Sequence, residues 1–204
     1  MHLNNNVPVN WFDMVVVIVL LFGLNKGRKR GMSEELMVTI QWVAIVIAGA
    51  FLYKPLGDML AASSPVSHVF CYVTIYVVMA VVTKIAFGLI KKAAGGKLVG
   101  SDVFGAGEYY LGMFAGAIRY ACMLVAALAI LNAPYYSPQE LNAARAYQNE
   151  WFGSNFFPEL SSVQLDVFKD SFVGSFIKKK AAVLLIASTK SESVVIKRRN
   201  EELP

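Results

Sequence analysis

Three ionisable residues lie inside long apolar runs of the sequence, and a fourth, Glu108, begins such a run. A charge at membrane depth is costly, so it usually faces a bundle interior, where it is paired or lines a pathway. Arg119 has three interpretations: a structural partner of Asp13 or of backbone carbonyls, a permeation site, or a side chain that reaches the interface where the bilayer thins. We expect structural pairing, because Asp13 and Arg119 both fall in the outer-to-middle zone of their runs. Lys84 lies within two turns of Lys91 and can extend its amine to the interface.

The remaining polar residues do not form a catalytic or metal-binding pattern. The two histidines, His2 and His68, are far apart and lack metal-ligand spacing. The glycines in residues 95–107 do not match the motifs that bind phosphate between a strand and a helix. Glu34 and Glu35 are better interpreted as acidic residues in the first turn of a helix, where the helix dipole favours them. The sequence therefore predicts no enzyme, no metal and no cofactor.

The elements that position these residues are apolar helices. Hydrophobic residues make up 56% of the 204 residues and charged residues 16%, whereas soluble domains carry about 25% charged residues. Apolar runs of membrane length predict an all-α integral membrane protein with four transmembrane helices, at about residues 7–24, 36–52, 66–90 and 109–131. Turn-forming residues predict a loop at 57–65, after a helix end at Tyr53–Pro55.

Basic residues predict the orientation in the membrane. Two short loops hold seven of them, whereas the loop between the second and third spans holds only Lys54. Short loops rich in Lys and Arg stay in the cytoplasm. We therefore expect a multi-pass protein of the bacterial inner membrane with both termini extracytoplasmic, anchored on the cytoplasmic side by Lys26, Arg28, Lys29, Arg30, Lys91 and Lys92. Since these residues flank apolar spans, the net charge of +5 indicates the lipid bilayer as a partner and not nucleic acid.

Small residues recur at every fourth position in two places, Gly23, Gly27 and Gly31 in the first and Gly112 and Gly116 in the second. In lipid, small residues at this spacing let helix backbones approach closely. The pattern predicts helix packing through these glycines, either within one chain or between the chains of a homo-oligomer.

Residues 134–204 differ from the four-span domain of residues 1–133. Their longest apolar run, 181–187, is too short to cross a bilayer. We expect an extracytoplasmic, interfacial region in which segments 139–151 and 160–177 form amphipathic helices, although a small soluble subdomain is an alternative. A broad apolar face is predicted for Leu160, Val163, Val167, Phe168, Phe172 and Phe176, and interfacial anchoring for Trp151, Phe152, Phe156 and Phe157. Residues 189–204 are expected to be a charged tail without packing.

Two sequence motifs combine these features. The first comprises Asn10-Trp11-Phe12-Asp13, an apolar run, Gly27-Arg28-Lys29-Arg30-Gly31 and Glu35-Leu36. The second runs from Glu108 through Gly112 and Gly116 to Arg119. Together they resemble the motifs of the colicin V production protein family, over about residues 10–131. Glu108 stands where that family usually has Asp, and Tyr120 where a Gly often stands.

This resemblance implies a four-span inner-membrane protein needed for production of a secreted peptide toxin and associated with envelope integrity. Our leading hypothesis is a non-enzymatic membrane protein that assembles through its glycine faces and supports export, with a periplasmic or export protein as a partner. The alternative is a small oligomeric channel or transporter that uses Asp13 and Arg119.

Overall fold

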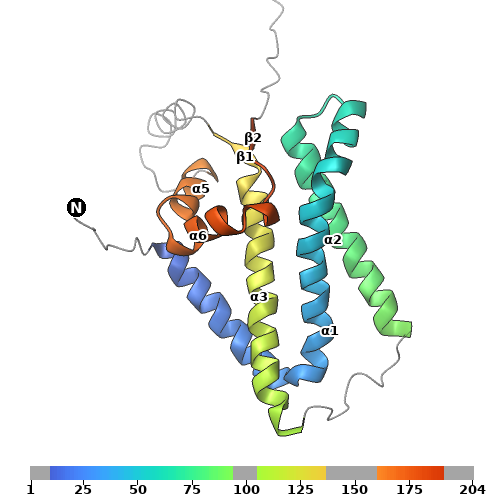
Figure 1. Ribbon diagram of the computed structural model, residues 1–204, viewed down its shortest axis with the longest axis vertical. Helices are drawn as coiled ribbons and strands as arrows, with labels where there is room; N and C mark the ends of the chain where they lie inside the picture. The colour runs from blue at the N-terminus through green and yellow to red at the C-terminus, as the bar shows by residue number, and fades with distance from the viewer. Residues whose placement is uncertain (1–9, 94–104, 137–159, 191–204) are drawn as a thin grey trace, which may run out of the picture.

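The computed structural model describes residues 10–93, 105–136 and 160–190 (Figure 1). These residues are nearly all helical, as the sequence predicts. Three helices are long and apolar enough to cross a membrane: α1 (Trp11–Ser63), α2 (His68–Ala93) and α3 (Glu108–Asn132). The shorter elements are η2 (Gly105–Gly107), β1 (Pro134–Tyr135), α5 (Leu160–Phe168), α6 (Phe172–Lys180), η3 (Ala182–Leu184) and β2 (Thr189–Lys190).

Helix α1 is two helices joined at Gly31, which has φ 76° and ψ 171°. Only glycine adopts this backbone conformation without strain. The chain changes direction there, so residues 11–30 form a first leg and residues 32–63 a second leg (Figure 1). The segments 7–24 and 36–52, predicted as separate spans, therefore belong to one helix whose break is a single residue.

The predicted loop at 57–65 is wrong for residues 57–63, since α1 continues through Pro55 to Ser63 and the chain turns only at 64–67. Gly57 does not form a turn. Instead, it gives room to the ring of Tyr72 on α2, which a β-carbon at position 57 would meet. The Tyr72 hydroxyl also donates a hydrogen bond to the carboxylate of Asp58. Packing between helices thus overrides the local turn chemistry.

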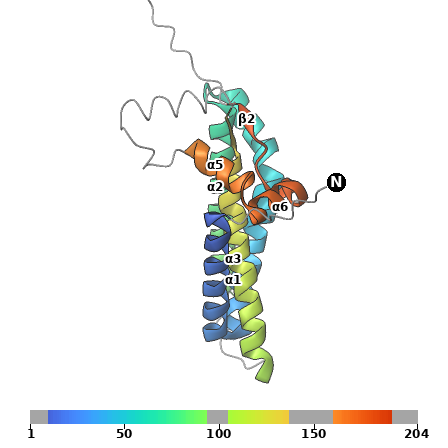
Figure 2. The same ribbon diagram turned by 90° about the vertical axis from the view of Figure 1, so that its left-hand side faces the viewer.

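Helix α3 lies between the two legs of α1 and contacts both, and α2 packs on the second leg (Figure 1). In the view turned by 90°, the same helices overlap, so that together they form a layer that is thinner than it is wide (Figure 2). The outer faces of this layer are apolar; on α2 they include Val77, Val81, Ile85 and Leu89, all exposed. Such surfaces suit lipid and are typical of a multi-pass membrane protein.

Helices α5 and α6 pack at the end of the bundle where α1 begins and α3 ends (Figures 1 and 2). One hydrophobic core joins them to the long helices and includes Phe12, Tyr53, Leu128, Val167 and Ile186. The side chain of Gln164 also donates to the carbonyls of Leu131 and Pro134.

The predicted broad face of segment 160–177 is wrong. The helix breaks between α5 and α6, so Val167 and Phe168 are buried while Leu160, Phe172 and Phe176 are exposed. The predicted tail is also wrong at its start, because Thr189–Lys190 pairs in parallel with Pro134–Tyr135. Segment 139–151, the aromatic residues at 151–157 and residues 191–204 lie outside the described residues.

Candidate functional site

The glycines of the two motifs contact each other within one chain. Gly27 lies against Gly112 and Gly116, and Gly23 lies against Gly116, so the first leg of α1 and α3 approach backbone to backbone. A β-carbon at Gly112 would come within 2.6 Å of the Gly27 carbonyl oxygen. The sequence left open whether this packing is within or between chains, and the structure places it within the chain.

Beside this glycine contact lies a buried ion pair. The guanidinium of Arg119, in the middle of α3, donates to the carboxylate of Glu35 at the start of the second leg. Glu35 is fully buried, and Arg119 is 4% exposed. The other oxygen of Glu35 lies 3.4 Å from Arg30, which is partly exposed. The arrangement places two cations on one carboxylate, next to the break at Gly31.

Glu108 joins the same junction from the start of α3. Its Oε1 accepts a hydrogen bond from the backbone N–H of Ser33, at the first turn of the second leg. The N–H groups of a helix's first turn have no partner within the helix, so a carboxylate there stabilises it. Thr39, one turn beyond Glu35, donates to the carbonyl of Ala115. Side chains of α3 therefore fix the position at which the second leg begins.

The expected pairing of Asp13 with Arg119 is wrong. Asp13 accepts hydrogen bonds from the Ser171 hydroxyl and from the backbone N–H groups of Phe172 and Val173, at 2.8–3.0 Å. It also accepts from the N–H of Asn10 in a capping box at the start of α1. Asp13 is thus the residue that holds the N-terminus of α6 to the first leg of α1.

The other predicted polar residues lie elsewhere. Lys84 is exposed on α2, far along the sequence from the break at Gly31. Lys26, Arg28, Lys29 and Arg30 lie in the last turns of the first leg, and Lys91 and Lys92 in the last turn of α2. Both groups lie at the same end of the bundle (Figure 1).

The role of Glu35 was missed from the sequence alone. Its place in the first turn of a helix was predicted, but its burial against Arg119 was not. The available signal was the spacing of the first motif, in which Glu35 follows Gly31 by four residues. That spacing corresponds to one helical turn beyond the break, on the face that meets α3.

The residues of this junction come from both motifs, which lie more than seventy residues apart in the sequence. The family model of the colicin V production protein matches residues 12–164, three quarters of the chain. The chain belongs to this family. No curated protein and no solved structure matches it significantly.

In this member of the colicin V production family, the junction consists of the ion pairs of Glu35 and of the Glu108 carboxylate that caps the second leg. The described residues include no cluster of three or more His, Cys, Asp or Glu side chains suited to a metal ion. Neither the cleft beside Arg28 and Tyr109 nor the cleft beside Tyr53 and Ile186 is lined by Glu35 or Arg119. Because its carboxylates pair with guanidinium groups or cap the start of the second leg, the junction is suited to fixing helices against one another.

Proposed function

We propose that this protein is a non-enzymatic scaffold of the inner membrane that supports export of a peptide toxin and envelope homeostasis. Membership of the colicin V production family supports the link to toxin production. The observation that most favours a scaffold is the buried pair of Arg119 and Glu35, closed by direct contact between glycines of α1 and α3.

The partners of the two candidate pathway residues argue against the channel alternative. Each carboxylate oxygen of Glu35 faces a guanidinium, from Arg119 and from Arg30. Asp13 accepts bonds from three groups at the start of α6. Groups engaged in this way hold helices to one another, and a relay or permeation role would require them to release these partners.

The glycine faces support assembly of the helices of one chain. Because the glycines of α1 and α3 already contact each other, a homo-oligomer would use another surface. The exposed apolar faces of α2 and of the first leg of α1 are the surfaces free for it.

The orientation we propose places the Gly31 end of the bundle in the cytoplasm. The basic residues at the end of the first leg and at the end of α2 support it by the positive-inside rule. Helices α5 and α6 would then lie on the periplasmic side, where a periplasmic or export partner has access to them. Labelling of single cysteines at Lys29 and Lys178 with a membrane-impermeant reagent tests this; labelling of position 29 from outside intact cells contradicts it.

The experiment on function uses a bacterial strain that lacks the gene for this protein. Glu35→Gln and Arg119→Leu are expected to reduce the amount of folded protein and, in parallel, toxin export and envelope integrity. The double variant Glu35→Arg/Arg119→Glu is expected to recover part of both. A variant that reaches normal levels, retains its thermal stability and loses ion flux in liposomes would support the channel in place of the scaffold.

A further inference from the structure

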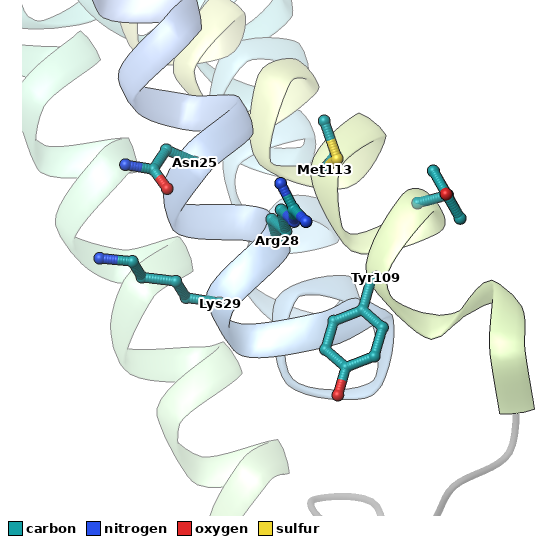
Figure 3. A pocket seen from close by; sticks show the side chains of 6 residues that line it. Asn25, Arg28, Lys29, Tyr109 and Met113 are labelled. Atoms are coloured by element: carbon teal, nitrogen blue, oxygen red, sulfur yellow. The ribbon is translucent and has the colours of Figure 1, made fainter.

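A cleft of about 700 Å³ lies between the first leg of α1 and the start of α3 (Figure 3). Its lining residues are Asn25, Arg28 and Lys29 from α1 and Tyr109, Tyr110 and Met113 from α3. In Figure 3 the Arg28 side chain lies between the two helices, whereas Asn25 and Lys29 extend from the rim of the cleft on the side of the first leg away from α3. The cleft is separate from the buried ion pair, because neither Glu35 nor Arg119 lines it.

The polar groups of the cleft are suited to an anion. The two ion pairs of the described residues involve Arg30 and Arg119, so Arg28 and Lys29 are cations without a carboxylate partner in the described part of the chain. The amide of Asn25 and the hydroxyls of Tyr109 and Tyr110 add further donors. Guanidinium and ammonium groups bind phosphate oxygens by charge-assisted hydrogen bonds.

The surface next to the cleft is suited to acyl chains. Ile18, Phe22, Asn25 and Lys29 follow one another at spacings of four, three and four residues, so they share one face of the first leg. Ile18 and Phe22, on the apolar part of this face, are 61% and 55% exposed. The same helix face thus leads from lipid-facing side chains to the cationic cleft.

The other wall of the cleft repeats this arrangement. On α3, the exposed Phe114 follows one turn after Tyr110, toward the middle of the helix. Tyrosines are enriched at the level of lipid headgroups, where the ring contacts apolar groups and the hydroxyl is hydrated. Both walls of the cleft therefore change from polar to apolar in the direction of the membrane core.

We propose that this cleft binds the phosphate of an anionic phospholipid, with Arg28 on the phosphate, Lys29 as a second cation at the rim of the cleft, and the acyl chains along the exposed Phe22 and Phe114. A free phosphate is also an anion that these cations could bind, but it has no acyl chains. The apolar faces that continue from the cleft favour the lipid as the source of that phosphate.

The test is native mass spectrometry of the full-length protein in mild detergent with added dioleoyl phosphatidylglycerol or dioleoyl phosphatidylcholine. We expect phosphatidylglycerol to be retained more strongly than phosphatidylcholine. The double variant Arg28→Gln/Lys29→Gln is expected to lose about tenfold or more of this affinity, since charged hydrogen bonds are lost. The matched control, Lys91→Gln/Lys92→Gln, removes the same charge at the same end of the bundle and is expected to change the affinity less than about twofold.

Three results would overturn the proposal. Equal losses in the two double variants would indicate a general attraction of basic residues to anionic lipid. Displacement of phosphatidylglycerol by millimolar inorganic phosphate would indicate an anion site without lipid specificity. If the double variant is poorly produced, the single variant Arg28→Gln replaces it, and unchanged phosphatidylglycerol affinity in that variant would exclude the cleft.

Discussion

The close contact between Gly112 and the first leg of α1 predicts that Gly112→Ala destabilises the protein. The new β-carbon would lie 2.6 Å from the Gly27 carbonyl oxygen and 2.7–2.8 Å from the backbone of Gly31, whereas ordinary contacts begin at 3.4 Å. The neighbouring atoms are backbone, so the helices must separate by several tenths of an ångström. A gap of about 0.5–1 Å forfeits about a quarter to a half of each dispersion contact along the seam.

The expected net effect of Gly112→Ala follows from two opposing contributions. Overpacking costs about 1–3 kcal/mol, and alanine's better helix propensity returns about 0.5–1 kcal/mol. We therefore expect the free energy of unfolding to fall, by up to about 2.5 kcal/mol. Gly88→Ala on α2 is the matched control, because a β-carbon there meets nothing within 4 Å and only the propensity gain applies.

The assay is unfolding by sodium dodecyl sulfate in mixed micelles, followed by far-ultraviolet circular dichroism. Gly112→Ala and Gly88→Ala are expected to shift the unfolding midpoint in opposite directions. If both variants become more stable, the glycine contact does not limit the approach of α1 and α3, and the reasoning is refuted.

Three further substitutions, with Lys84→Leu as a control, test the junction and its supports. Arg119→Leu leaves Glu35 buried without its main partner and is expected to lower the free energy of unfolding by about 3–5 kcal/mol. Lys84→Leu, on an exposed face, should leave the thermal midpoint in detergent nearly unchanged. Equal effects of the two variants would contradict the ion pair. Asp13→Ala removes the cap of α6 and is expected to lower the free energy of unfolding by about 1–2 kcal/mol and to speed hydrogen exchange in residues 172–177. Unchanged exchange in these residues would exclude the capping role. Gly31→Ala forces a side chain into a conformation suited only to glycine, with an expected cost of about 1–3 kcal/mol in the same thermal assay, and an unaltered midpoint would mean that the break lies elsewhere.

Much of the bundle was predictable because its signals are local in the sequence. Apolar runs of membrane length predict the long helices, and the span at 109–131 differs from α3 by one residue at each end. The glycine spacing indicates a close helix contact, since side chains one turn apart share a face. The basic residues at the ends of the first leg and of α2 were predictable for the same reason, since they directly follow apolar runs in the sequence.

Other features depended on which segments meet in space. Turn chemistry at 57–65 predicted a loop, but contact with Tyr72 keeps Gly57 helical. The periodicity of segment 160–177 predicted one face, but the chain breaks where Asp13 caps the start of α6. The periodicity of one segment cannot predict a hydrogen bond with a residue 158 positions away, such as that between Ser171 and Asp13.

The sequence by itself determined that this is a helical membrane protein, that Arg119 needs a buried partner and that the glycines mark a close contact. Only the tertiary structure decided that the partner is Glu35 and not Asp13. The reason is geometric: the break at Gly31 directs the second leg of α1 back along α3, which brings Glu35 beside Arg119 and leaves Asp13 at the far end of the first leg.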